Sequence, residues 1–140
     1  MVYNYPSTRA EVIELMRNKG VTPTQQRIEI AQALFARPQH LSADQVLALV
    51  NQQRASVSKA TVYNTLGLFA RKGLVREVIV DPTKVFYDPT MAPHHHFFNV
   101  DTGELIDVEP GHFEMSELPP PPPGTRAEGV DVVIRIRNSH

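Results

Sequence analysis

Three consecutive histidines are the residues of this 140-residue chain best suited to chemistry. His94, His95 and His96 open a segment that predicts a β-strand, in which successive side chains point to opposite faces. His94 and His96 therefore share a face, and two imidazoles on one face can share a cation. Another histidine and two carboxylates stand at positions that could supply further ligands. The candidate metal ligands are His40, Asp88, His94, His96 and Asp107.

The absence of cysteine restricts the kind of metal site that the chain can build. A disulfide framework, an iron–sulfur cluster, a thiolate-held structural zinc and a cysteine nucleophile are all excluded. Imidazole and carboxylate ligands together suit iron, manganese or zinc. The alternative interpretation is a surface loop that is rich in histidine and binds nothing.

Signatures of enzymes are missing from the sequence. It contains no nucleophile elbow, no phosphate-binding glycine loop and no H-E-x-x-H motif. A hydrolytic metal site made of the same His and Asp residues is the enzyme alternative, but it leaves the basic, helical first half without a role. We therefore expect a protein that is not an enzyme.

Hydrophobic spacing and capping residues predict four helices, followed by a β-hairpin, in residues 1–88. After the fourth helix the apolar period changes to two, which indicates strands at 74–80 and 85–87 around a turn. This order is typical of a winged helix-turn-helix domain. The helices are expected from Arg9 to Lys19, Thr24 to about Ala36, Ser42 toward Gln53, and Ser56 or Ser58 to Gly73.

The fourth helix is the candidate for DNA recognition. Its apolar positions Ala60, Val62, Leu66 and Phe69 are expected to face the core. On the other side, a tyrosine ring can pack on a thymine methyl group and an asparagine can bond the edge of an adenine. The alternative is a solvated helix in another kind of small helical domain. The DNA-binding candidates are Lys59, Thr61, Tyr63, Asn64 and Arg71, with Arg27 on the second helix.

Residues 89–140 have a different texture, with loops and short strands in place of helices. Strands are expected at 94–100, 104–108 and 130–137, and apolar and polar residues alternate strongly in the last of these. Pro119–Pro123 must be extended, as a spacer or as a ligand for a partner. Two domains of this size hold small cores, and assembly into a dimer would relieve that shortage.

Charge is distributed unevenly along the chain. Residues 1–72 hold nine basic and four acidic residues, a net charge of +5, whereas the remainder holds five basic and eleven acidic residues, a net charge of −6. A basic first half suits a nucleic-acid partner. No segment has the length of a membrane span or the layout of a signal peptide, so we expect a cytoplasmic protein with no membrane partner.

Five separated motifs together resemble the ferric uptake regulator family. They are V-T-P-T-Q-Q-R from Val21, H-L-S-A-D from His40, A-T-V-Y-N-T-L from Ala60, K-G-L-V from Lys72 and H-H-H from His94, in the expected order. The resemblance implies a homodimeric winged-helix repressor of iron homeostasis that binds double-stranded operator DNA. It implies that residues 89–140 form a small α/β dimerisation and sensing domain, so that the whole chain is of the α+β class. It also implies that His40, Asp88, His94, His96 and Asp107 form a regulatory metal site bridging the two domains.

Departures from the family pattern are similar to those of its iron response regulator branch. Asn99 and Thr102 stand where the family usually has a C-x-x-C pair, so a structural zinc held by four cysteines is not expected. Asn64 replaces the usual arginine, and the chain stops after the last strand, without a final helix. This branch implies haem as a possible ligand of the triple histidine. A second metal or haem site would use His95 and Glu114.

The expected mechanism is a hinge near Pro89. Ligands from both domains on one ion would fix the angle between the domains, and with it the spacing of the two recognition helices in the dimer. A peroxide sensor, in which site iron oxidises a histidine ligand, makes the same demand on the sequence. A DNA-bound architectural protein with a vestigial site is the third alternative.

Overall fold

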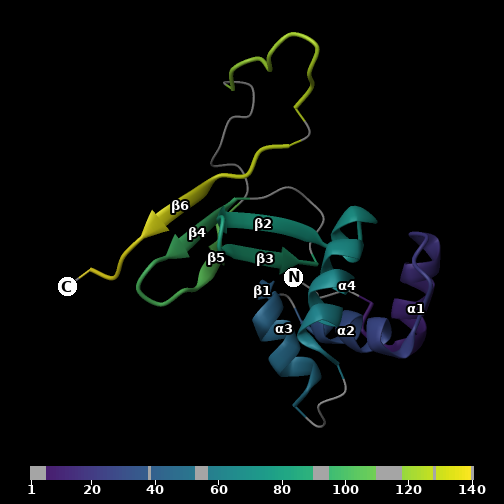
Figure 1. The fold of residues 1–140 in the computed structure, drawn as a ribbon. Helices are drawn as coiled ribbons and strands as arrows, with labels where there is room; N and C mark the ends of the chain where they lie inside the picture. Colours follow the sequence, from purple (N-terminus) through teal and green to yellow (C-terminus); the bar gives the residue numbers. More distant parts are fainter. Residues whose placement is uncertain are drawn as a thin grey trace. The chain divides into compact units, whose positions relative to one another are not determined.

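The computed structural model describes residues 6–37, 39–52, 57–89, 95–109, 118–127 and 129–139 (Figure 1). The chain divides into two compact units, Met1–Met91 and Ala92–His140. The sequence placed the boundary after residue 88. None of the helices in the described ranges is long and apolar enough to cross a membrane.

The first unit contains the four predicted helices. Each begins after a threonine or serine whose side chain accepts a hydrogen bond from the backbone N–H three residues on, and this satisfies one of the donors left over in a first helical turn. Ser42 and Gln45 form the predicted capping box. The helices are α1 (Arg9–Asn18), α2 (Gln25–Phe35), α3 (Ala43–Val50) and α4 (Lys59–Arg71).

A three-stranded sheet accompanies these helices in the first unit. The predicted hairpin is present as β2 (Arg76–Asp81) and β3 (Lys84–Asp88). The sequence did not predict β1 (Leu41–Ser42), which pairs antiparallel with β3 and gives the strand order β1-β3-β2. Two residues are too few to show a hydrophobic period, so only the pairing with β3 reveals this strand.

The core of the first unit lies among the four helices. Val62, Leu66 and Phe69 of α4 are buried in it, as expected. The expectation for Ala60 was wrong, because this side chain is exposed and Thr65 is buried instead. Positions 62, 65, 66 and 69 follow the three- and four-residue spacing of one helix face, and position 60 falls outside it.

The second unit contains a separate three-stranded sheet. It consists of β4 (His96–Asn99), β5 (Leu105–Asp107) and β6 (Val133–Ile136), in the order β5-β4-β6. The central strand β4 runs antiparallel to β5 and parallel to β6. All three strands were expected and all are shorter than predicted. Pro119–Pro123 are exposed.

A hydrogen-bonded turn follows β4 and includes Asn99 and Thr102. The Asn99 side-chain oxygen accepts bonds from the N–H groups of Asp101 (2.9 Å) and Thr102 (3.2 Å), and its amide group donates to Asn138 Oδ1 (2.9 Å). Gly103 closes the turn at a φ of 78°, which favours glycine. Hydrogen bonds therefore hold this turn without any thiolate.

Replacing Asn99 by Ala should cost about 1–2 kcal/mol of stability in the second unit, because the N–H groups of Asp101 and Thr102 lose the acceptor of two partly buried hydrogen bonds. Hydrogen exchange of the Asp101 and Thr102 amides should quicken markedly. Asn138→Ala is the matched control, since it removes a single bond of the same network. Equal protection of both amides in Asn99→Ala and the parent protein would contradict this role.

Candidate metal centre and nucleic-acid interface

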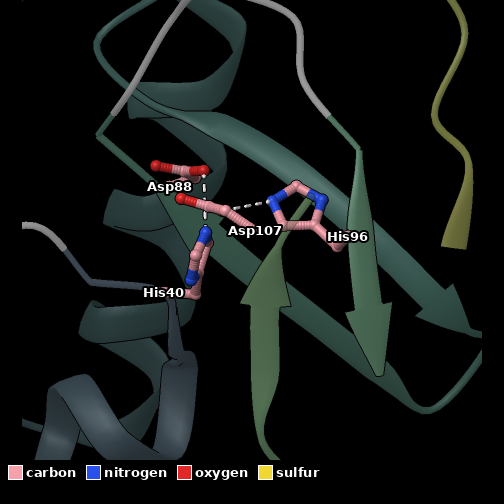
Figure 2. A group of neighbouring side chains, drawn as sticks. All are labelled: His40, Asp88, His96 and Asp107. Atoms are coloured by element: carbon pink, nitrogen blue, oxygen red, sulfur yellow. Dashed lines mark ion pairs between the residues drawn. The ribbon is translucent and has the colours of Figure 1, made fainter. Parts of the chain in front are cut away.

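Strand register brings the first histidine and carboxylate together. In the antiparallel pairing of β1 with β3, Leu41 lies opposite Tyr87, so His40 and Asp88 are the next pair along the ladder. His40 Nε2 lies 3.1 Å from Asp88 Oδ2 (Figure 2). The His40 side chain is 13% exposed and that of Asp88 is 2% exposed. Two candidate ligands far apart in sequence are thus neighbours within the first unit.

The second unit repeats this arrangement. His96 and Asp107 lie directly opposite each other in the antiparallel pairing of β4 with β5. His96 Nε2 is 3.2 Å from Asp107 Oδ1, and the dashed line in Figure 2 marks this pair. The His96 side chain is fully buried, while that of Asp107 is 58% exposed. Each unit therefore presents one imidazole nitrogen beside one carboxylate oxygen.

The spacing within each pair suits neighbouring ligands on a metal ion. Two atoms bound at about 2.1 Å and at right angles around one ion lie about 3.0 Å apart. The nitrogen–oxygen separations in the two pairs, 3.1 and 3.2 Å, are close to this distance between neighbouring ligand atoms. The donors are nitrogen and oxygen, the combination that suits iron, manganese and zinc. The residues present therefore fit such an ion.

Three further residues were candidate metal ligands. His94 and Glu114 lie outside the described residues. His95 is half-buried, and its Nδ1 accepts a hydrogen bond of 3.0 Å from the backbone N–H of Val132. This nitrogen of His95 is therefore engaged by the backbone. The sequence missed this bond because it depends on the residue that precedes β6 in the parallel pairing.

Helix α4 presents most of the predicted DNA-binding residues to solvent. Lys59, Tyr63, Asn64 and Arg71 are exposed. Thr61 is half-buried, and its hydroxyl accepts a hydrogen bond from the N-cap residue, Ser58, at 2.9 Å. It therefore takes part in the helix cap.

Arg27 on α2 is also partly committed to structure. Its guanidinium donates a hydrogen bond of 2.9 Å to the carbonyl oxygen of Thr22 in the loop that precedes the helix. A partner that the sequence did not indicate is Asp44 of α3, which accepts a hydrogen bond from the Tyr63 hydroxyl. The nucleic-acid candidates thus divide into open side chains on α4 and side chains held by the fold.

Tyr87 lies beside Asp88 on β3 and contributes no charge there. Burial, and then the charges of Glu77 and Tyr63, raise the pKa of Tyr87 above its ordinary value. The phenol therefore stays neutral throughout the physiological range. Asp88 is the group next to His40 that supplies negative charge.

Comparison with known proteins gives consistent results. Residues 18–117 match the model of the Ferric uptake regulator family. The Peroxide operon regulator of Bacillus subtilis (strain 168) is 30% identical over 109 residues, which are 77% of this chain and 75% of that protein. The solved ferric uptake regulator from Pseudomonas aeruginosa with manganese is 28% identical, with a TM-score of 0.64 over 91% of this chain and 97% of that one.

A further solved structure, the ferric uptake regulator of Vibrio cholerae, is similar in fold. It has a TM-score of 0.71 at 19% identity and covers 91% of this chain and 99% of its own. These likenesses confirm the predicted α+β class, with a winged-helix domain and a small α/β domain. They do not single out the iron response regulator branch, because the curated relative is a peroxide regulator.

Asp88→Ala should destabilise the metal-free protein by about 1–3 kcal/mol, because it leaves a void at a buried site and removes the partner of His40. Urea unfolding in the presence of a chelator measures this change. Glu77→Ala, an exposed carboxylate on the neighbouring strand, should change stability by no more than about 0.5 kcal/mol. If the two variants have equal midpoints, the Asp88 carboxylate does not contribute to the fold.

Proposed function

Because the chain belongs to the ferric uptake regulator family, we propose that it is a metal-responsive DNA-binding repressor whose two His–Asp pairs hold one shared ion. The observation that carries this proposal is the matched geometry of the pairs, with one in each unit. Each pair has an imidazole nitrogen and a carboxylate oxygen at the spacing of neighbouring ligands. Two pairs together supply the four protein ligands that a regulatory site needs.

The short connection between the units supports a shared ion. Asp88 ends β3 and His96 begins β4, so only residues 89–95 separate one pair from the other. A linker of this length spans at most about 25 Å when fully extended. Once one pair has bound an ion, the other remains at high effective concentration. His94, inside this linker, is the candidate for a fifth ligand.

The donors and the relatives support a small set of candidate ions. Nitrogen and carboxylate oxygen without thiolate favour iron, manganese or zinc. The solved ferric uptake regulator from Pseudomonas aeruginosa was obtained with manganese. When bound, the ion supplies a positive charge that joins ligands from both units, and iron is the physiological metal that a regulator of iron homeostasis would use.

DNA binding is assigned to residues 1–88 and dimerisation to residues 89–140. The exposed face of α4 enters the major groove of operator DNA, with Tyr63 and Asn64 at base edges and Lys59 and Arg71 at phosphates. Arg27 is a weaker phosphate candidate because it bonds to Thr22. In a homodimer, the shared ion fixes the angle between the units near Pro89, and so sets the spacing of two recognition helices.

His40→Ala and His96→Ala should each lower the affinity for Mn²⁺ by about tenfold or more, and each should abolish the effect of Mn²⁺ on DNA affinity. The two changes are expected to be non-additive, because either one breaks the same site. Fluorescence anisotropy with a duplex selected from random DNA, with and without Mn²⁺, gives both quantities.

Glu104→Gln, an exposed carboxylate of the second unit, is the control and should respond to Mn²⁺ like the parent protein. A different result would separate the parts of the proposal. If His40→Ala removes the response and His96→Ala preserves it, the ion belongs to the first unit alone. If neither variant alters the response, these pairs are not the regulatory site.

Peroxide sensing is the second candidate function, and the similarity to the Peroxide operon regulator favours it. In this version iron at the same site directs oxidation of a histidine ligand, and DNA is then released. Mass spectrometry after hydrogen peroxide treatment of Fe²⁺-loaded protein should locate one added oxygen atom on His40 or His96. Mn²⁺-loaded protein is the control, and oxidation confined to methionines would contradict this candidate.

Haem remains a further prediction for the histidine cluster. An absorption spectrum recorded during haem addition tests it. A sharp endpoint that His95→Ala or His96→Ala removes would support haem, and a spectrum identical to that of haem in buffer would contradict it. A cytoplasmic location also stays a prediction.

A further inference from the structure

An acidic side chain lies against the two residues that begin the exposed face of α4. Tyr63 Oη donates a hydrogen bond to Asp44 Oδ1 over 3.2 Å. Lys59 Nζ lies 3.8 Å from the same oxygen, and 5.6 Å from the centre of the Tyr63 ring. A single carboxylate oxygen of α3 therefore contacts both an aromatic and a basic side chain of α4.

The local fold fixes the position of this carboxylate. Asp44 lies in the first turn of α3, next to the capped N-terminus set by Ser42. Its neighbours Ala43 and Val46 are buried, and this fixes the rotation of α3 about its axis. A carboxylate in a first helical turn is also stabilised by the helix dipole. The packing of Ala43 and Val46 thus fixes the position of Asp44 on the surface.

The Asp44 carboxylate is also unfavourable for DNA binding. The first half of the chain carries a net charge of +5, and the face of α4 is the part proposed to meet phosphates. A negative charge there weakens attraction to any DNA, whatever its sequence. Its ion pair with Lys59 is of little compensating value, because both side chains are about two-thirds exposed. The contact of Asp44 with Lys59 and Tyr63 must therefore have a function other than raising the affinity for DNA in general.

The hydrogen bond to Tyr63 supplies that reason. The Tyr63 side chain is 44% exposed, and an exposed tyrosine without a partner samples several rotamers. A bond from its hydroxyl to a fixed carboxylate selects one rotamer before DNA arrives. Side-chain ordering then costs less when a base edge is bound, and this gain is realised only on DNA that offers the matching contact.

We propose that Asp44 is a positioning residue that holds Tyr63 for base recognition, and thereby raises discrimination between operator and other DNA while lowering affinity for DNA in general. This inference rests on the proposed function of α4 as the recognition helix. It concerns how that helix selects a sequence, and does not depend on which metal is bound.

Two substitutions at Asp44 separate the hydrogen bond from the charge. Asp44→Asn keeps an oxygen that can accept from Tyr63 and removes the negative charge. Asp44→Ala removes both. Both variants should bind random-sequence DNA more tightly than the parent protein, and this gain should shrink at high salt because it is electrostatic. Only Asp44→Ala should lose discrimination.

Anisotropy titrations with a selected operator duplex and a random duplex of equal length measure discrimination as a ratio of affinities. In Asp44→Ala this ratio should fall by about five- to tenfold, the range expected for one lost hydrogen bond. Asp44→Asn should change it by less than about twofold. Tyr63→Phe should reproduce the fall, and adding Asp44→Ala to Tyr63→Phe should lower the ratio no further.

NMR of the protein without DNA tests the rotamer directly. The Tyr63 side-chain couplings should report a single χ1 rotamer in the parent protein and in Asp44→Asn, and averaging in Asp44→Ala. Circular dichroism should give melting temperatures within about 5 °C of one another for all three, since Asp44 is exposed and its interaction with the helix dipole contributes at most about 1 kcal/mol.

Failure of this inference and failure of the proposed function give different results. If the parent protein discriminates and Tyr63→Phe loses discrimination, but Asp44→Ala retains it, Asp44 does not position Tyr63. If Tyr63→Phe retains full discrimination, the Tyr63 hydroxyl and its hydrogen bond to Asp44 are not needed for base recognition, and the inference fails. If the parent protein binds both duplexes equally in every metal state, the proposed function itself is wrong.

Discussion

Antiparallel strand register is the constraint on which the candidate metal site depends. In each unit it sets one histidine opposite one aspartate, His40 with Asp88 and His96 with Asp107. A slip of one residue in either ladder would turn a ligand to the opposite face of its sheet. Both pairings are short, so the buried residues around them must hold the register. In the first unit Leu41, Phe86 and Tyr87 are buried beside the pair.

The segment from His40 to Asp44 joins the two activities proposed for the first unit. His40 is a candidate metal ligand, Leu41 and Ser42 form β1, and Ser42 also caps α3. Two residues later, Asp44 accepts the hydrogen bond from Tyr63 on α4. Five consecutive residues thus run from the metal ligands to the helix proposed to read DNA.

The sequence predicted the elements of the fold better than their contacts. Capping residues such as Ser42 and Ser58 marked the helix starts, because a cap is a local bond. Strand β1 was missed because its two residues carry no period of their own. The hydrogen bonds of Arg27 to Thr22 and of Val132 to His95 were missed as well. They depend on backbone positions that composition and spacing do not reveal.

The candidate ligands were predicted by a different route. The residue types and the family resemblance together indicated His40, Asp88, His96 and Asp107, and the structure pairs them two by two. Spacing in the sequence could not show which histidine lies beside which aspartate, because register is a property of the folded sheets. Asp44 ends the H-L-S-A-D motif, but nothing in the sequence indicated its contact with Tyr63, since an acidic residue in a first helical turn is common and is usually explained by the helix dipole.

The central claim is that His40 and His96 bind the same ion, and ¹⁵N NMR of the histidine rings during titration with Zn²⁺ tests it most directly. The account predicts that the Nε2 signals of both rings shift together and stop changing at about one equivalent of Zn²⁺ per chain. Shifts of one ring without the other, or separate endpoints for the two rings, would contradict it.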